Sequence, residues 1–424
     1  MFGWLGGLSW RERTALRATF GAWTADGFSV QLFAFVLPGL LSAWHVTTSA
    51  AGFLATMTLL ASAFGGWIAG AFADRFGRVR VLQVVVAWFA LFTFLSGFTQ
   101  DFQQLFICRV LQGFGAGAEW AVGTVLMGEV IRDTHRGRAV GLVQAGWPLG
   151  WGIAAVLYMV LTALLPESLA WRVLFWSGLG PALLVLWMRR NLDEPDYLGA
   201  EEPSGFTQIA AMFRSAHWPT TWRVSLMLVG AQESSYALLT FLPIYLRTER
   251  HLTAVGTAGY LLALIAGSFL GIFTGGYLAD RIGRKATFMV SLIGSAMLTV
   301  VAMLFPFTNQ IMMPVGFLLG FISMMMFAPM GPLMTELFPA AVRAVAQGFC
   351  YNFGRAVGAI FPALVGMLAG LLGLGWAIAI FAGCGFALMM VGLSLLPETR
   401  GRTLESLEAV IPAEAASPAQ DQPR

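Results

Sequence analysis

Six ionisable side chains of this 424-residue chain stand out inside long apolar runs: Asp26, Arg109, Glu119, Glu233, Arg355 and, nearer the surface, Glu129. A charged group at such a position is costly, so it indicates a function. A carboxylate removed from water binds a proton more readily, whereas a buried arginine stays charged and its planar guanidinium fits a carboxylate. We therefore expect proton coupling at Asp26, Glu119 and Glu233 and anion binding at the two arginines. The alternative is that these acids and arginines pair with one another to hold the fold together.

Uncharged polar residues in the same kind of run extend this candidate site. Tyr351 and Asn352 precede one buried arginine, Gln232 precedes a buried acid, and Gln144 lies in a further apolar run. Such side chains can hydrogen-bond to a carboxylate or a hydroxyl group, although they also join helices to one another. The predicted substrate-binding set is Arg355, Arg109, Asn352, Gln232, Tyr351 and Gln144.

The composition places the chain in a lipid bilayer. Apolar residues make up 58% of it, charged residues make up 11%, and its mean hydropathy is +0.74, whereas a soluble domain carries about 25% charged residues. The three cysteines and four histidines are scattered without the spacing of a metal site. No phosphate-binding GxxxxGK(S/T) sequence occurs. We expect no metal, no cofactor, no catalytic residues and no nucleic-acid partner.

Twelve apolar runs are long enough, at about 20 residues, to cross a bilayer as helices. They cover residues 18–43, 49–73, 79–99, 104–130, 138–164, 171–190, 223–246, 254–279, 285–305, 309–337, 343–371 and 374–396. A long polar stretch in the middle divides them six and six. We expect an all-α integral membrane protein with an N-terminal six-helix bundle (1–190), a cytoplasmic linker (191–222), a C-terminal six-helix bundle (223–398) and a cytoplasmic tail (399–424).

The basic residues predict the orientation of these spans. Most arginines and the single lysine, Lys285, fall in loops on one side, whereas Arg172, Arg247 and Arg250 lie near span ends on the other side. Because loops rich in basic residues stay in the cytoplasm, both termini are predicted to be cytoplasmic. The expected location is the cytoplasmic (inner) membrane, which the chain crosses many times.

A nine-residue sequence recurs after the second and the eighth span. Residues 70–78 read GAFADRFGR, and residues 276–284 read GYLADRIGR, 206 positions later. Residues 129 and 136 (Glu, Arg) recur as Glu and Arg at an offset of 207. The two halves are therefore predicted to be parallel repeats related by an axis along the membrane normal. In proteins of this kind the substrate site lies near the midplane, between the halves.

The repeated loops carry acids and arginines together, which predicts ion pairs that latch one side of the protein and break when the halves rock. Their glycines allow a tight turn and a close approach of helices. The alternative is that the arginines only hold the loops in the cytoplasm. The predicted gating set is Asp74, Arg75, Gly77, Arg78, Glu129, Arg136, Arg138, Asp280, Arg281, Gly283, Arg284, Glu336 and Arg343. Within it, we expect Glu129 to pair with Arg136 or Arg138, and Glu336 to pair with Arg343.

These motifs resemble those of the major facilitator superfamily. The resemblance covers essentially the whole chain and includes both DRxGR loops, RVLQG at 109–113 and PETRGR at 397–402. DGF at 26–28 and GAEW at 117–120 further resemble proton-coupled symporters of organic acids, such as sialic-acid, monocarboxylate and aromatic-acid carriers. Many of those carriers have a second acid three residues after the first, where this chain has Ser29. The resemblance implies that the first and seventh spans face each other across a central cavity.

The predicted function is secondary active symport of an organic acid anion with protons, by alternating access and as a monomer. A sugar or polyol symporter is an alternative because of the PETRGR ending, although a neutral sugar needs no arginine at mid-membrane. A metabolite or drug exporter is another, because the interior is rich in aromatic residues. An enzyme is not expected, since the four histidines lie apart, and a sensor would need an added cytoplasmic domain.

Overall fold

The computed structural model describes residues 3–132, 136–192, 218–305, 307–338 and 340–400, and this part of the chain folds into helices joined by turns. A short helix, η1 (Gly3–Gly7), comes first. The predicted linker lies mostly outside the described residues. The long helices form twelve spans, as predicted: α1 (Trp10–Ala43), α2 (Thr48–Phe76), α3 (Arg78–Ser96), α4 (Phe102–Val130), α5 with α6 (Arg136–Gln144, Gly146–Leu164), α7 with η3 and α8 (Glu167–Trp176, Ser177–Leu179, Pro181–Asn191), α10 (Trp218–Thr248), α11 (Ala254–Ile282), α12 (Arg284–Leu304), α13 with α14 (Asn309–Met325, Phe327–Leu337), α15 with α16 (Ala340–Gly358, Phe361–Leu372) and α17 (Leu374–Ser394).

The outside of this bundle is apolar. Large side chains such as Leu183 and Leu371 are 71% and 82% exposed, which is the surface that lipid covers. Ten helical segments of the described chain are long and apolar enough to cross a membrane. The other two spans, α4 and α10, contain the buried ionisable residues Arg109, Glu119 and Glu233. Asp26 and Arg355, by contrast, lie in spans that are apolar enough to be among the ten.

Four of the predicted continuous spans are broken in the structure. The fifth and tenth spans are interrupted at Ala145 and Met326, and the sixth and eleventh also consist of two helices. Pro181 and Pro362 lie in the first turn of α8 and α16, where a missing backbone N–H costs nothing. An apolar run shows that a segment crosses the membrane, but the run does not reveal a break inside it.

Some element ends also differ from the predicted ones. The first helix begins at Trp10 rather than at residue 18, because Ser9 and Glu12 form a capping box there. Helix α10 begins at Trp218 rather than at residue 223. Thr399, predicted to start the tail, is buried in the packed part of the chain. The packed structure is therefore longer than the apolar runs alone indicate.

The two halves pack their helices in the same way. A Cβ atom added to Gly65 of α2 would lie 1.9 Å from the carbonyl oxygen of Phe114 in α4. A Cβ atom added to Gly271 of α11 would lie 2.0 Å from the carbonyl oxygen of Phe321 in α13. The glycines are 206 positions apart and the phenylalanines 207, so the repeat found in the sequence is also a repeat of helix contacts. Glycine permits this backbone contact because it has no side chain.

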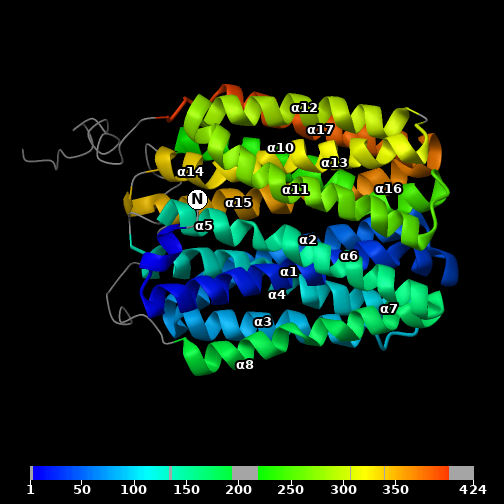
Figure 1. Ribbon diagram of the computed structural model, residues 1–424, viewed down its shortest axis with the longest axis horizontal. Coiled ribbons are helices and arrows are strands. Elements are labelled where there is room, and N and C mark those ends of the chain that lie inside the picture. The colour runs from blue at the N-terminus through cyan, green and yellow to red at the C-terminus, as the bar shows by residue number, and fades with distance from the viewer. Residues whose placement is uncertain (1–2, 133–135, 193–217, 306, 339, 401–424) are drawn as a thin grey trace, which may run out of the picture.

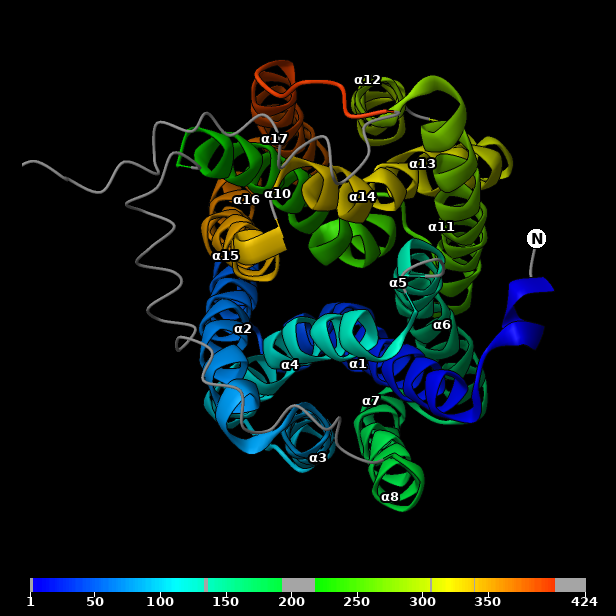
Figure 2. The same cartoon turned by 90° about the vertical axis from the view of Figure 1, so that its left-hand side faces the viewer.

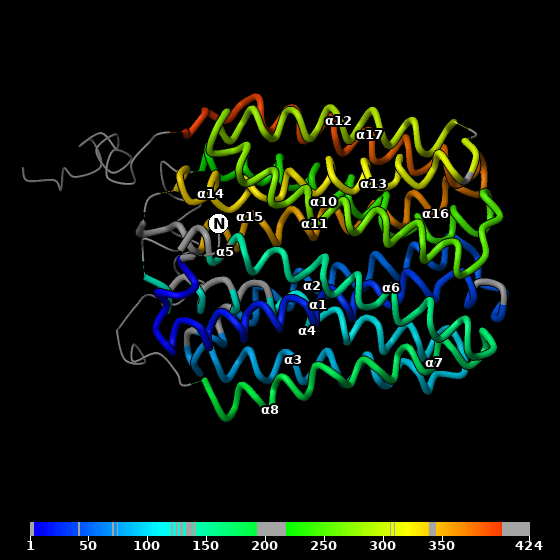
Figure 3. Tube along the Cα trace, viewed as in Figure 1, coloured from blue at the N-terminus to red at the C-terminus, as the bar shows by residue number. Residues whose placement is uncertain are grey.

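The halves meet along two seams. Figures 1 and 3 show α1–α8 and α10–α17 as two layers along the long axis. Figure 2, which looks along the helices, shows α2 beside α15 and α16 at one edge and α6 beside α11 at the other. At the first seam, a Cβ atom on Gly52 would lie 2.3 Å from the carbonyl oxygen of Pro362, and the Thr48 hydroxyl donates to the Gly366 carbonyl at 3.3 Å. Backbone therefore touches backbone across the boundary.

The two ends of the bundle differ in charge and are named here for later use. The arginine-rich end is the one where α1 begins and where the turns at Gly77 and Gly283 lie, at the left of Figure 1. The opposite end is the one where α7 begins and α10 stops, at the right of Figure 1.

Candidate functional site

Asp26 lies in α1 at the point where this helix crosses α6. Gly27 permits the crossing, because a Cβ atom there would lie 2.4 Å from the carbonyl oxygen of Trp147. The Asp26 side chain is buried, and the indole of Trp147 hydrogen-bonds to its carboxylate. Its Oδ1 atom has no partner. The crossing therefore places a carboxylate with one unused oxygen in the interior.

Arg109 lies on the side of α4 that faces α1. Its Nη1 donates to the carbonyl of Ser29 at 3.3 Å, and its Nη2 donates to the carbonyl of Val30 at 3.5 Å. The guanidinium carbon lies 4.9 Å from the centre of the Phe33 ring, a cation–π distance. Its Nε has no partner. The backbone of α1 thus holds this buried arginine.

Glu119 lies on the same helix, nearer to the arginine-rich end. Its side chain is 1% exposed, and its Oε2 has no partner. The carboxylate interacts electrostatically with Asp26 and with Arg355. Two acids and an arginine from three different helices therefore share one buried region.

Arg355 reaches this region from α15 in the C-terminal half. Its Nη1 donates to the hydroxyl of Ser62 on α2 at 2.7 Å, which joins the two halves. Its guanidinium carbon lies 5.1 Å from the centre of the Tyr351 ring, and it hydrogen-bonds to Tyr236 on α10. It also acts electrostatically on Asp26, while its Nε has no partner. Arg355 is therefore charged and buried, and at least one of its N–H donors has no acceptor within the described protein.

The predicted polar neighbours are placed in different surroundings. The Nδ2 of buried Asn352 donates to the Gly348 carbonyl at 3.0 Å, and its Oδ1 has no partner. A Cβ atom on Gly66 of α2 would lie 2.6 Å from that Oδ1, so Asn352 faces the N-terminal half. Gln232 is buried with an unpartnered Nε2. Gln144 is half-buried at the last position of α5, where the fifth span breaks.

Glu233 stands apart from the cluster of charges. Its side chain is fully buried in α10, and neither carboxylate oxygen has a partner. Within the described chain, no charged side chain acts on it. The structure therefore brings Asp26 and Glu119 together with Arg109 and Arg355, but it does not add Glu233 to them.

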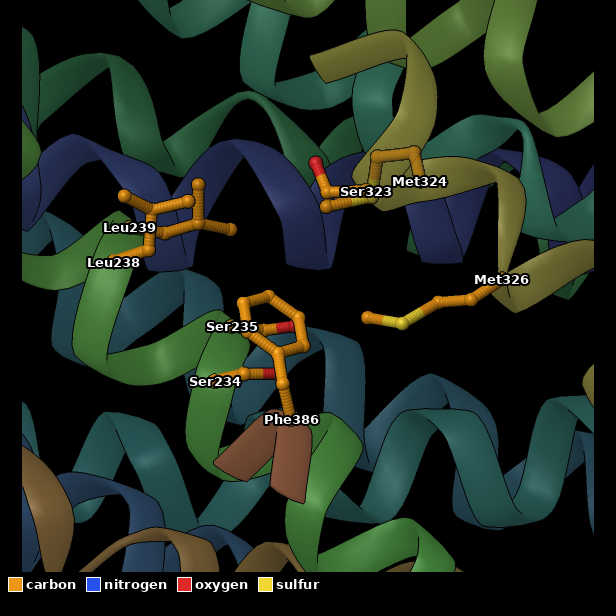
Figure 4. A pocket seen from close by; sticks show the side chains of 8 residues that line it. All are labelled: Ser234, Ser235, Leu238, Leu239, Ser323, Met324, Met326 and Phe386. Atoms are coloured by element: carbon orange, nitrogen blue, oxygen red, sulfur yellow. The ribbon is translucent and has the colours of Figure 1, made fainter. Parts of the chain in front are cut away.

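A small pocket lies between α10, α17 and the break that separates α13 from α14 (Figure 4). Its volume of about 10 Å³ is close to the space that one water molecule needs. Figure 4 shows Ser234, Ser235 and Phe386 on one side and Met326 reaching toward them from the other. The two serine hydroxyls donate to the Ala231 carbonyl at 3.2 and 2.8 Å. The break in the tenth span thus brings methionine side chains to the interior.

Two further buried polar residues, one on α2 and one on α4, were not predicted as site residues. Ser62 accepts the hydrogen bond from Arg355. Gln112 is fully buried, and neither polar atom of its side chain has a partner. Each is a polar residue in an apolar run, a signal too common to single it out. Unpartnered buried polar atoms gathered in one region indicate room for a ligand or for ordered water.

At the arginine-rich end, Arg284 is the centre of a cluster of ion pairs. Its guanidinium pairs with Asp280 at 3.0 Å and with Glu336 at 2.9 Å. The Thr399 hydroxyl donates to the second oxygen of Glu336. Glu336 thus pairs with Arg284, because the turn after α11 places Arg284 beside α14. The side chain of Arg343 lies outside the described part of the chain, so its pairing with Glu336 stays a prediction.

The two repeated loops form matching turns. Gly77 and Gly283 have φ angles of 99° and 109°, in the left-handed region that favours glycine. Each glycine ends one helix and starts the next. Arg75 and Arg281 are exposed, and Arg78 is half-buried. The remaining predicted gating side chains lie outside the described part of the structure: Asp74, Glu129, Arg136, Arg138 and Arg343.

Two further ion pairs were not predicted. At the arginine-rich end, Arg132 pairs with Glu12 of α1 at 2.6 Å. At the opposite end, Arg247 of α10 pairs with Glu167 of α7, so this pair joins the two halves. Neither pair belongs to a repeated motif, which is why the sequence alone offered no signal for them.

The chain matches the family model described as Major Facilitator Superfamily over residues 19–360 and 261–416. It is 40% identical over 421 residues to the probable 4-methylmuconolactone transporter of Cupriavidus pinatubonensis, covering 99% of this chain and 97% of that protein. It is 28% identical to the cis,cis-muconate transport protein of Acinetobacter baylyi, over 88% of this chain and 92% of that one. The solved structure of a D-xylose-proton symporter matches with a TM-score of 0.74 at 16% identity, covering 92% of this chain and 99% of that one.

Proposed function

The chain belongs to the major facilitator superfamily, and we propose that it carries an organic acid anion together with protons across the membrane by alternating access. The observation that carries the proposal is the buried cluster at the boundary of the halves, where Arg355 and Arg109 lie near the acids Asp26 and Glu119. A guanidinium group binds a carboxylate, and an intramembrane acid can carry a proton. Both requirements of anion–proton symport are thus met in one place.

The relatives support an organic acid as the substrate. Proteins named as transporters of 4-methylmuconolactone and of cis,cis-muconate align with nearly the whole chain. The family and these relatives are transporters, as predicted, and not enzymes. We therefore propose a small organic acid of this kind as the substrate of this chain.

In the proposed site, Arg355 receives the carboxylate of the substrate. Its unpartnered Nε supports this role, because a buried donor without an acceptor is costly. Tyr351 and Asn352, from the same helix, complete the contact, and Asn352 still has an unused oxygen. Gln232 and Gln144 are further proposed contacts.

Asp26 and Glu119 are the proposed proton carriers. Both are buried with an unpartnered carboxylate oxygen, and each acts electrostatically on the other. Arg109 is proposed to bias this pair through its fixed charge while the backbone of α1 holds it. Glu233 remains a third candidate, separate from the pair and within the C-terminal half.

The proposed orientation places the arginine-rich end in the cytoplasm, because basic residues gather there. The Arg284 cluster and the matching turn at Gly77 are then cytoplasmic gates that change when the halves rock. The Glu167–Arg247 pair lies on the outer side in this orientation. A single chain contains both halves, so a monomer suffices for the cycle.

The test uses purified protein in liposomes that contain a pH-sensitive dye. We would add 4-methylmuconolactone, cis,cis-muconate and nicotinate outside, with xylose and glucose as matched neutral solutes and protein-free liposomes as the leak control. Acidification of the interior with at least one acid, and with neither sugar, is the expected result. If no acid acidifies the interior, or if only a sugar does so, organic-acid symport is refuted.

A further inference from the structure

We propose that Ser62 is a positioning residue for the substrate: it holds one end of the Arg355 guanidinium, so that the Nε side of that group faces the incoming anion. This inference rests on the proposed function, because it assigns to Arg355 the carboxylate of the substrate. Ser62 lies in the N-terminal half and Arg355 in the C-terminal half, so the contact also spans the boundary that moves during transport.

The geometry of the contact supports this role. Ser62 is 5% exposed, and its hydroxyl oxygen accepts from Nη1 of Arg355 at 2.7 Å. The Tyr351 ring lies 5.1 Å from the guanidinium carbon and restrains one face of the group. The Nε atom is buried and has no partner. One end of the planar group is thus fixed, its face is restrained, and a donor remains for a ligand.

The position of Ser62 is itself fixed by the packing of α2 on α4. A Cβ atom on Gly117 would lie 1.7 Å from the carbonyl oxygen of Ser62 and 2.5 Å from its hydroxyl oxygen. The two backbones are therefore in contact at this point. Glu119 follows Gly117 by two residues, so the same contact sets where Ser62 lies relative to a proposed proton carrier. A group held by rigid neighbours positions its partner more precisely than a group on a loop.

Comparison of the two repeats shows that the contact between Ser62 and Arg355 has no equivalent at the matching positions of the other half. Ser268 lies 206 positions after Ser62 and is fully buried in α11. Its hydroxyl donates to the Leu264 carbonyl of its own helix at 2.9 Å. The position 207 before Arg355 is Pro148, which has no charge to offer. The serine is thus present in both halves, but only Ser62 contacts an arginine across the boundary.

The test measures uptake kinetics in liposomes with cis,cis-muconate and 4-methylmuconolactone as probes. Ser62→Ala should raise KM about tenfold and leave kcat within about twofold, because a guanidinium without its fixed end is no longer preorganised for the carboxylate. Ser62→Thr, which keeps a hydroxyl group, should restore KM. Ser268→Ala is the matched control and should leave both constants unchanged.

A KM for Ser62→Ala equal to that of the wild type, with the wild type transporting either probe, would overturn this inference alone. A variant that lowers kcat or the folded yield without raising KM would do the same, because it would show a purely structural role. If the wild type transports neither acid, the proposed function fails, and the role of Ser62 in binding fails with it.

Discussion

The two buried arginines of the cluster differ in what holds them. Arg109 donates to the carbonyls of Ser29 and Val30 and stacks on Phe33, so the contacts that hold it come from the N-terminal half. Arg355 donates across the boundary to Ser62 at 2.7 Å and also hydrogen-bonds to Tyr236 of its own half. Ser29, three residues after Asp26, contacts Arg109 through its backbone carbonyl. Asp26 is the acid of α1 that acts electrostatically on this arginine.

Replacing Arg355→Gln should reduce saturable anion uptake at least about 100-fold, because the amide carries no charge to balance a buried carboxylate. The protein should remain folded, since Arg355 forms no ion pair in the described part of the chain. Uptake in liposomes and a melting curve in detergent measure the two effects. Arg109→Gln is the comparison, and it should lower the melting temperature more, because two carbonyls of α1 lose their donor. Wild-type uptake by Arg355→Gln would remove this residue from the site.

Replacing Asp26→Asn should uncouple uptake from the pH gradient. The amide oxygen can still accept from Trp147, but the side chain can no longer gain and lose a proton. In the wild type, uptake should accelerate as the outside becomes more acidic than the inside, whereas the variant should show a flat profile with exchange of substrate preserved. Glu119→Gln and Glu233→Gln in the same assay identify which acid carries the proton. An unchanged slope in Asp26→Asn would assign the coupling to one of those two residues.

At the scale of elements, the two halves close equivalent helix ends with arginines from different places. Arg172 of α7 donates to the carbonyls of Gly97 and Thr99, just after α3, at 3.0 and 2.8 Å. Arg250, which follows α10, donates to the carbonyl of Phe305 at the end of α12. Carbonyls at a helix C-terminus attract cations. The repeat therefore preserves the capped helix end rather than the residue that caps it.

The start of α12 is closed by an acid from the end of the chain's last span. The Glu398 carboxylate accepts from the backbone N–H groups of Arg284 at 2.9 Å and Lys285 at 3.0 Å. Partial burial alone would raise the pKa of Glu398, but the N–H donors of Arg400, Arg284, Thr399 and Lys285 outweigh it and lower that pKa below its ordinary value. Glu398 of the PETRGR sequence thus caps the helix that follows the DRxGR turn.

Replacing Glu398→Gln should lower the melting temperature by about 1–3 °C near neutral pH. A carboxylate whose pKa is lowered in the folded state stabilises the fold above its ordinary pKa, near 4.5, and this contribution is lost as the pH falls through the folded-state value. Melting curves of both proteins should therefore differ most above about pH 5 and converge in more acidic buffer. A difference that stays constant at every pH would show that the charge does not matter.

At the scale of the whole molecule, the halves are joined at the opposite end by contacts that alternating access must break. Arg247 of α10 pairs with Glu167 and hydrogen-bonds to the buried Tyr158, both in the N-terminal half. The Thr48 hydroxyl donates to the Gly366 carbonyl across the other seam. Opening this end breaks both sets of contacts. The free energy of these contacts therefore sets how often the end opens.

Reversing one charge of the Glu167–Arg247 pair should favour opening of this end. Glu167→Arg or Arg247→Glu places like charges together, and each should raise the maleimide labelling rate of a cysteine placed at Thr48 about threefold. The labelling would be done in a background without the three native cysteines. The double variant Glu167→Arg with Arg247→Glu restores an ion pair and should restore the slow rate. Equal labelling of all four proteins would show that the pair does not act as a gate.

The sequence by itself determined the twelve spans, the duplication and the buried charges of this protein. The bilayer imposes these features on each short stretch of sequence separately. A span must be apolar over its own length, and a charged residue within it is therefore easy to recognise. The matching turns at Gly77 and Gly283 were visible for a similar reason, since a sharp turn needs particular residues at fixed positions.

Only the tertiary structure decided which of these groups meet. It joined Glu336 to Arg284, separated Glu233 from the other acids, broke four spans and placed Ser62 against Arg355. These outcomes depend on how helices far apart in the chain rotate and cross, and that is set by close contacts such as the one between Gly117 and Ser62. A serine in an apolar run looks the same in the sequence whether its hydroxyl turns back to its own helix or accepts from an arginine of the other half.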